Sequence, residues 1–148
     1  MTLIINKKAH FNYEILERYE AGIELLGIEV KAVRAKRGSL EGAHITVRGG
    51  EAYLIGMTIE PYQASNTIKG HEPSRNRRLL LTKKEIAELA AIESKKGLTI
   101  VPLGVYNKGR KIKVEIAVAK NKKTHDKRET LKKREAERDV MREIKSAR

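Results

Sequence analysis

The segment "HITVRGGEAYLIGMTIEP", residues 44–61, is the clearest local structure in this sequence of 148 residues. Ile45 and Val47 alternate with polar residues on its first arm. On the second arm every second residue is apolar: Tyr53, Ile55, Met57 and Ile59. Strict alternation predicts strands with one buried face. Because Gly49 and Gly50 can adopt the positive φ angles of a two-residue turn, the segment is predicted to be a β-hairpin.

A second hairpin is predicted towards the carboxyl end. The segments "LTIVPLGVY" (98–106) and "RKIKVEIAVAK" (110–120) flank the turn "NKG". In the second arm apolar residues alternate with charged ones: Ile112, Val114, Ile116 and Val118. The opposite face of this arm carries Lys111, Lys113 and Glu115. A basic face of this kind can lie along a phosphate backbone.

A strand and a short helix are predicted before the first hairpin. Residues 11–21, "FNYEILERYEA", have apolar side chains with a period of two, which indicates a strand with one wet face. Gly22 interrupts this pattern. Apolar residues at three- and four-residue steps then predict an amphipathic helix near 23–36, which Gly38 can terminate.

A loop and a second helix are predicted between the two hairpins. Residues 63–78 are polar and irregular, with Pro73 among them, and long loops in small domains are often functional. Thr82 is a good N-cap, and Glu85 three residues later completes a capping box. A helix is therefore predicted near 82–96.

The element order predicts the fold class. Five strands with a helix between the third and the fourth are the order of an oligonucleotide-binding (OB) barrel. We therefore predict a mainly β fold with flanking helices over residues 1–119, as a small closed or partly open OB-like barrel. A ferredoxin-like sheet is the main alternative. Residues 120–148 form a basic tail outside this body.

The composition predicts a polyanionic partner. The formal net charge is +13, of which the first 119 residues contribute +7 and the last 29 contribute +6. Such an excess favours nucleic acid over membrane, and the alternative is that the basic residues only keep the protein soluble. Cysteine is absent, and neither a signal-peptide core nor a membrane-spanning segment is found. We therefore expect a cytoplasmic location.

No catalytic set is found in the sequence. The four histidines are scattered, without the spacing of metal ligands: His10, His44, His71 and His125. His125 is followed by Asp126, but a flexible tail cannot hold the geometry that proton transfer needs. We expect a protein without enzymatic activity, cofactor or metal site.

Arg75 and Arg77 are candidate RNA-binding residues within "EPSRNRRLLL", residues 72–81. In an extended segment they project to the same side, and guanidinium groups at this spacing can bridge phosphates or stack on unpaired bases. The alternative is that they form surface ion pairs with Glu72 and Glu85. The sequence leaves both interpretations open.

The tail has a pattern that favours conditional folding. From residue 132 a helix would align a basic stripe, an acidic stripe and a thin apolar stripe. The basic stripe consists of Arg134, Arg138 and Arg142. An isolated helix of this length is marginal in water. We predict a tail that is disordered alone and becomes helical in a polyanionic groove. The alternative is a solvated terminus without a function.

Four ordered stretches resemble the SmpB family, the transfer-messenger RNA-binding or SsrA-binding proteins. The stretches are "NKKAHFNYEILERYEAGIELLGIEVKAVRAKRGSL" (6–40), "GGEAYLIGMTIEPY" (49–62), "HEPSRNRRLLL" (71–81) and "KKTHDKRETLKKREAERD" (122–139). The resemblance implies an OB-related barrel, a tail unstructured in solution, and a monomer when free. It implies binding to the tRNA-like domain of transfer-messenger RNA (SsrA RNA) and a requirement in trans-translation, the rescue of stalled ribosomes. The ribosomal small subunit is an implied partner, with elongation factor Tu and alanyl-tRNA synthetase as indirect partners.

The resemblance carries four RNA-binding positions to Asn6, Glu20, Leu80 and Lys113. Asn6 offers a donor and an acceptor for a base edge or sugar, and Lys113 is an expected phosphate contact. Glu20 is expected to accept hydrogen bonds from base amino or ribose hydroxyl groups, with a cross-strand salt bridge as the alternative. Leu80 is either a contact or support for the core.

The resemblance also assigns the tail to the empty message channel, in place of codon–anticodon pairing. The residues that match the decoding-centre segment are Lys122, Lys123, Asp126, Lys127 and Arg128, and we add Arg134 and Arg138 to this set. Two positions depart from the usual pattern. Asn121 replaces a glycine, but asparagine tolerates a left-handed backbone, so a hinge is still expected there. Phe11 replaces a histidine found in many members, so no polar role is expected at that position.

Overall fold

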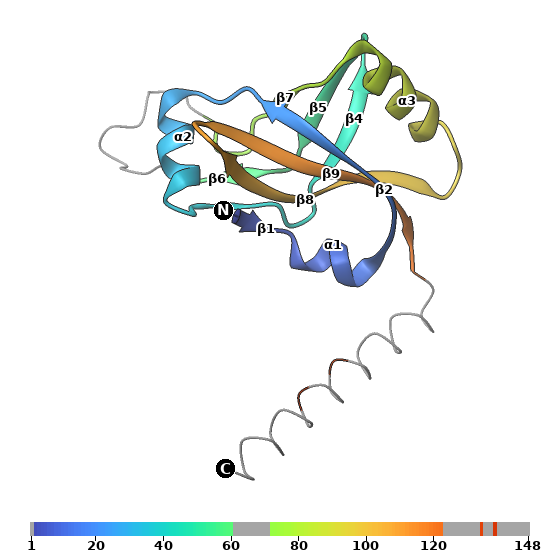
Figure 1. Cartoon of the computed structure of the whole chain (residues 1–148), viewed down its shortest axis with the longest axis horizontal. Coiled ribbons are helices and arrows are strands. Elements are labelled where there is room, and N and C mark those ends of the chain that lie inside the picture. The colour runs from blue at the N-terminus through green and yellow to red at the C-terminus, as the bar shows by residue number, and fades with distance from the viewer. Residues whose placement is uncertain (1, 61–71, 123–133, 135–137, 139–148) are drawn as a thin grey trace.

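The computed structural model of the chain describes residues 2–60 and 72–122, together with Arg134 and Arg138 (Figure 1). The described helices are α1 (Lys7–Asn12), α2 (Gly27–Arg34) and α3 (Lys83–Glu93). The strands are β1 (Thr2–Ile5), β2 (Tyr13–Ile23), β3 (Gly38–Ser39), β4 (His44–Arg48), β5 (Glu51–Ile55), β6 (Thr58–Ile59), β7 (Arg77–Leu80), β8 (Leu98–Lys108) and β9 (Lys111–Asn121). In Figure 1, α2 and α3 lie at opposite ends of the curved sheet.

Seven strands form one antiparallel sheet in the order β1-β8-β9-β2-β7-β5-β4, and β3 pairs separately with β6. This confirms the predicted mainly β fold with flanking helices. The sheet curves until β4 lies against β8. Its edge strands β1 and β4 are not paired with each other in the described part of the chain. Of the two predicted forms, closed and partly open, the structure has the partly open one.

The first predicted hairpin is present. β4 and β5 pair up to Arg48 and Glu51, and the intervening Gly49 and Gly50 have φ angles of 58° and 76°. Its second arm is shorter than predicted, because β5 ends at Ile55 and the next strand, β6, pairs with β3.

The second predicted hairpin is also present, but its turn is Gly109-Arg110 and not "NKG", because Asn107 and Lys108 belong to β8. β8 and β9 pair from Leu98 opposite Lys120 to Lys108 opposite Lys111. β9 continues to Asn121, two residues beyond the predicted end of the body at residue 119. Asn121 pairs with Tyr13 in β2 and is not among the residues with positive φ, so the left-handed hinge expected there is absent.

Both predicted helices exist. The N-cap of α3 is Thr82: its side chain accepts a hydrogen bond from the Glu85 amide at 3.2 Å, and the Glu85 carboxylate accepts one from the Thr82 amide at 3.0 Å. α2 is shorter than predicted because Ile23 still belongs to β2. The positive φ after this helix, 62°, occurs at Lys36 and not at Gly38, which lies in β3.

Four elements are absent from the sequence-based prediction: β1, α1, β3 and β7. Phe11, predicted to begin a strand, lies in α1, and the strand begins at Tyr13. The predicted loop 63–78 is also too long, since Arg77 and Arg78 belong to β7, which pairs with β2 and β5. A strand of four residues is too short for its alternation to stand out from the sequence.

The main sheet buries side chains on both faces. On β9 the predicted alternation is confirmed: Val114, Ile116 and Val118 are buried in the main core. We call this side the inner face. The opposite, outer face buries Ala117 and Ala119 in a second cluster beneath α1, which contributes Ala9.

A β-bulge in β2 changes the face of the sheet on which alternate side chains lie. Ile15 is opposite Ala119, but Glu17 is opposite Val118, so Leu16 is an extra residue. Residues before the bulge, such as Ile15, pack on the outer cluster, whereas Ala21 lies in the inner core. The predicted strand with a single wet face is therefore wrong.

Candidate nucleic-acid interface

The outer face of the sheet is covered at one end and open at the other. α1 packs over the outer face of β8 and β2 at the second apolar cluster. Beyond it we define the open outer face by six residues: Glu20, Gly22, Leu80, Tyr106, Lys113 and Glu115. The strand register places all six on one side of β2, β7, β8 and β9.

Four residues of the open outer face form one row across four strands. Tyr106 is opposite Lys113, Lys113 is opposite Gly22, and Gly22 is opposite Leu80. At the usual strand spacing this row is roughly 14 Å long. Glu20 and Glu115 are opposite each other in the adjacent row. The structure thus brings together three of the predicted RNA-binding residues: Glu20, Leu80 and Lys113.

Leu80 is exposed because its neighbour lacks a side chain. A Cβ atom at Gly22 would lie only 3.1 Å from the Leu80 Cβ. Leu80 lies against this glycine and remains 48% exposed, whereas Leu79 is fully buried in the core. The alternative that Leu80 supports the core is therefore wrong, and Leu79 has that role.

Glu20 is held in place by two residues of β8. Its carboxylate accepts a hydrogen bond from the Tyr106 hydroxyl and another from the Lys108 ammonium at 2.9 Å. The bond from Tyr106 and then the bond from Lys108 lower the pKa of Glu20. Burial, followed by the bond to Glu20, raises the pKa of Tyr106. Glu20 is therefore an ionised acceptor with a fixed orientation, and its side chain is still 40% exposed.

Lys113 lies at the centre of the row and is half-buried. Among the described residues it makes no hydrogen bond or ion pair, although its charge also lowers the pKa of Glu20. Its stem lies between Tyr106 and Gly22 in the register. The ammonium group is therefore available to an anionic partner.

Asn6 has a different role from the one predicted. It is buried, and its side-chain oxygen caps α1 by accepting a hydrogen bond from the Ala9 amide at 3.2 Å. Its side-chain nitrogen donates to the carbonyls of Pro102 at 2.8 Å and Leu40 at 3.3 Å. These bonds occupy the amide inside the protein, so Asn6 joins β1, α1 and β8 and does not present a base-reading edge.

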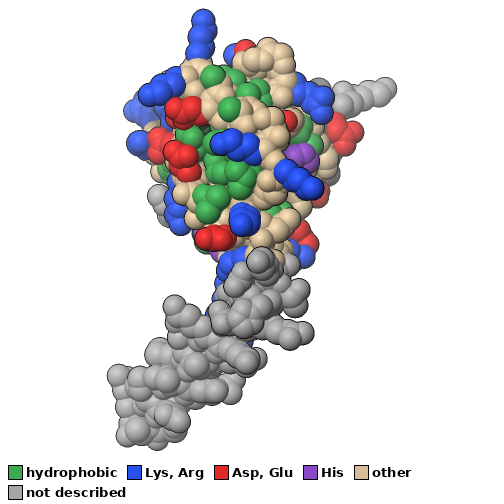
Figure 2. Space-filling model, turned by 90° about the vertical axis from the view of Figure 1, so that its right-hand side faces the viewer, with side chains coloured by type: hydrophobic (Ala, Val, Ile, Leu, Met, Phe, Trp, Pro, Cys, Tyr) green, Lys and Arg blue, Asp and Glu red, His purple; other side chains and the backbone are tan. Residues whose placement is uncertain are grey.

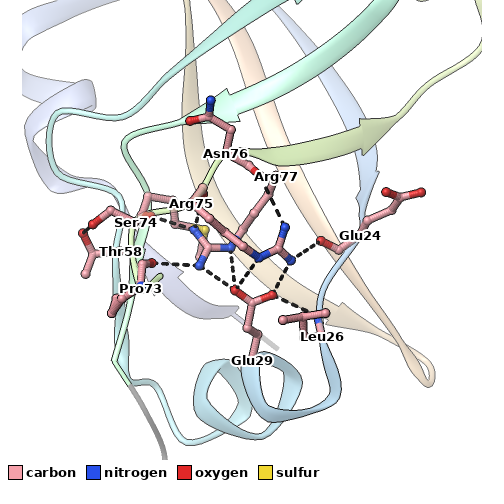
Figure 3. A network of polar contacts seen from close by, with 10 residues as sticks. Glu24, Leu26, Glu29, Thr58, Pro73, Ser74, Arg75, Asn76 and Arg77 are labelled. Atoms are coloured by element: carbon pink, nitrogen blue, oxygen red, sulfur yellow. Dashed lines mark hydrogen bonds and ion pairs between the residues drawn. The ribbon is translucent and has the colours of Figure 1, made fainter. Parts of the chain in front are cut away.

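Arg77 is also unsuited to the predicted phosphate contact. Its side chain is fully buried and donates to Glu29 at 2.7 Å (Figure 3). It also donates to the backbone carbonyls of Met57, Pro73 and Arg75. Because all of these acceptors are protein atoms, the Arg77 side chain connects β7 to α2 and to the segment before β7.

Arg75 shares the same carboxylate. It donates to Glu29 at 2.5 and 3.1 Å, and its side chain is 29% exposed. Burial alone would raise the pKa of Glu29, but hydrogen bonds from Arg75, the Leu26 amide and Arg77 outweigh it and lower the pKa to about 2. The predicted alternative partners, Glu72 and Glu85, are not the ones used.

Part of the tail is described. The Lys122 amide donates to the Asn12 carbonyl at 2.9 Å. Arg134 and Arg138 are helical and exposed, and the Arg134 guanidinium lies 5.8 Å from the centre of the Phe11 ring. Four predicted tail residues lie outside the described residues: Lys123, Asp126, Lys127 and Arg128.

The described part of the chain has neither a candidate metal site nor a membrane-spanning helix. Residues 2–60, 72–122, 134 and 138 contain no group of three or more His, Asp or Glu residues that could hold a metal ion. None of the helices described there is long and apolar enough to cross a membrane.

In Figure 2 basic and acidic side chains are interspersed around exposed apolar ones on the face shown. Charge on this face is therefore mixed and not uniformly basic.

Tyr106 and Lys108, which orient Glu20, were missed by the sequence analysis. They are 86 and 88 residues from Glu20 along the chain, so only the register of β8, β9 and β2 reveals the contact. The predicted hairpin did not reveal this contact, because its predicted turn "NKG" places Tyr106 beside Arg110, whereas the observed turn at Gly109-Arg110 places it opposite Lys113.

Comparisons with known proteins agree on one family. The family model described as "SmpB protein" matches residues 3–146. The "SsrA-binding protein" of Gloeothece citriformis is 53% identical over 140 residues, covering 95% of this chain and 90% of that relative. The "SsrA-binding protein" of Mesoplasma florum is 50% identical over 143 residues, covering 97% and 96%. A solved structure described as "tmRNA-SmpB: a journey to the center of the bacterial ribosome" contains a similar chain with TM-score 0.70 and 40% identity, covering 84% of this chain and 87% of that one.

Proposed function

This chain belongs to the SmpB protein family, and from that premise we propose that it binds the tRNA-like domain of transfer-messenger RNA and acts in trans-translation. The names of its relatives and the description of the similar solved chain, which mentions both this RNA and the ribosome, support the proposal. The net charge of +13 agrees with a polyanionic partner.

The observation that carries the proposal is the grouping of Lys113, Glu20 and Leu80 on the open outer face. Lys113 supplies a positive charge for a phosphate, and Glu20 supplies an oriented acceptor for base amino or ribose hydroxyl groups. Leu80 adds an exposed apolar contact beside them. A donor, an acceptor and an apolar surface on a rigid sheet suit recognition of folded RNA with unpaired bases. We propose that this curved sheet is a variant of the OB barrel.

We propose a separate role for the tail. Its basic residues, from Lys122 through Arg138, occupy the message channel of the small subunit and replace codon–anticodon pairing there. Contacts with ribosomal RNA order the tail there. The protein works by binding and not by catalysis, in the cytoplasm, and it meets elongation factor Tu and alanyl-tRNA synthetase only through the RNA.

Recovery of bound RNA from cells tests the function. The full chain is isolated from cell extract and its RNA is sequenced, with ordinary tRNA as the internal competitor. We expect transfer-messenger RNA to be strongly enriched over tRNA. A generic RNA-binding module would recover both without preference, and that result would refute the proposal.

Truncation tests whether the body and the tail have separate functions. The deletion removes residues 123–148, because β9 extends to Asn121 and the Lys122 amide bonds to α1. The truncated protein is expected to bind the tRNA-like domain with nearly unchanged affinity and to lose tagging of stalled peptides. If the truncated protein still supports tagging, the tail is not required for trans-translation.

A further inference from the structure

A depression lies next to the open outer face. It has a volume of about 230 Å³ and is bounded by β1, β2, α1, β8 and β9. Tyr106 and Glu115 belong both to this depression and to the open outer face. A ligand that covers the open outer face therefore reaches the depression without a break in the surface.

The floor and one wall of the depression are apolar. Leu103, which is 3% exposed, lies at the floor beside Gly104. A Cβ atom at Gly104 would lie 3.0 Å from the Ile4 carbonyl oxygen, so the glycine lets β1 lie close to β8. Ile5 is opposite Gly104 and is 56% exposed, the highest value among the exposed large apolar residues of the described chain.

The lining also contains an aromatic ring whose hydroxyl is hydrogen-bonded. Tyr106 lines the depression, and its hydroxyl donates to the carboxylate of Glu20. The ring is therefore held at the border between the depression and the open outer face. An exposed isoleucine near an oriented aromatic ring forms a surface suited to a flat, partly apolar ligand.

The rim of the depression offers donors and an acceptor. The Arg18 guanidinium bonds to the Glu115 carboxylate at 2.9 Å, and His10 of α1 is exposed beside them. Donors and acceptors at a rim match the edges of a nucleobase. The carboxylate of Glu115 lies in this lining, which disfavours a phosphate inside the depression.

We propose that the depression between Ile5 and Tyr106 binds one unpaired base of the RNA. This inference rests on the proposed function, because that function supplies the RNA. The apolar floor and Ile5 contact the face of the base, and the side chains of Arg18, His10 and Glu115 face its edge. The base is thereby anchored next to the phosphate contact of Lys113.

An abasic scan combined with two protein variants tests this site. The RNA is the tRNA-like domain, prepared as a series in which one loop nucleotide at a time lacks its base. The proteins are the full chain, Ile5→Ala and the control Leu16→Ala. Ile5 and Leu16 are 56% and 51% exposed, so neither substitution should disturb folding, and only Ile5 lines the depression.

The expected result is coupling at a single nucleotide. Removing its base should weaken binding to the unmodified chain and to Leu16→Ala by about tenfold. For Ile5→Ala, removing the same base should weaken binding by only about threefold or less relative to intact RNA. The reason is that the substitution has already removed the contact. If base removal weakens binding to Ile5→Ala as much as binding to the unmodified chain at every position, the proposed site is wrong. The proposed function would be unaffected by that result. Failure of the unmodified chain to bind the RNA at all would overturn both.

Discussion

The open outer face and the Glu29–Arg75–Arg77 network use the same kinds of side chain under opposite conditions. In the network, the side chains of Glu29 and Arg77 are fully buried and their bonds end on protein atoms. On the open outer face, Glu20 is 40% exposed and Lys113 has no described partner. Burial, more than residue type, thus separates charges that hold the fold together from charges that remain available to a partner.

The largest expected effect lies in the network. Arg77→Ala leaves the buried carboxylate of Glu29 with fewer donors and frees three carbonyl acceptors. We expect the free energy of unfolding, measured by urea denaturation, to fall by roughly 3–5 kcal/mol. Lys113→Ala is the control and should change it by less than about 0.5 kcal/mol. If both substitutions lower the free energy of unfolding equally, the network does not stabilise the fold more than the open outer face does.

The same network predicts a dependence of stability on pH. Since the pKa of Glu29 is lowered from 4.5 to about 2 in the folded protein, its contribution is complete above about pH 4.5 and is lost as the pH falls towards 2. Between pH 6 and pH 3 this carboxylate should account for about 2 kcal/mol of lost stability. Urea midpoints of the unmodified chain and Glu29→Gln should therefore converge on acidification. A constant difference between them would show that Glu29 is not held ionised.

A smaller effect, on binding alone, is expected on the open outer face. Lys113→Ala should weaken binding to the tRNA-like domain and make the salt dependence shallower by roughly one counterion. Affinity measured at several salt concentrations gives this slope. Lys31→Ala on α2 is a matched control, exposed but outside the open outer face. If the slope is the same for all three proteins, Lys113 does not contact a phosphate.

Local signals in the sequence were reliable predictors of structure. The Thr82–Glu85 capping box and the Gly49-Gly50 turn involve residues at most three positions apart, and both are present as predicted. The bulge at Leu16 was not predictable, because it depends on how β2 pairs with β9. Apolar residues have the same phase in the sequence before the bulge (Tyr13 and Ile15) and after it (Tyr19 and Ala21), although the side chains change face.

The site was only partly predictable for the same reason. The partners that bury Asn6 are 34 and 96 residues away, and Glu29 is 48 residues from Arg77. Their sequence context alone does not distinguish a buried polar anchor from an exposed contact. Glu20, Leu80 and Lys113 came from the family resemblance, and the structure adds that they lie together with Tyr106 on one open surface.

Side-chain footprinting with hydroxyl radicals tests whether the RNA covers the open outer face. The full chain is oxidised with and without the tRNA-like domain, and the reactivity of each side chain is read by mass spectrometry. We expect Leu80 and Tyr106 to lose reactivity in the complex, while Ile86 and Ile92 of the helix α3 keep theirs. Protection of α3 with unchanged Leu80 and Tyr106 would contradict it.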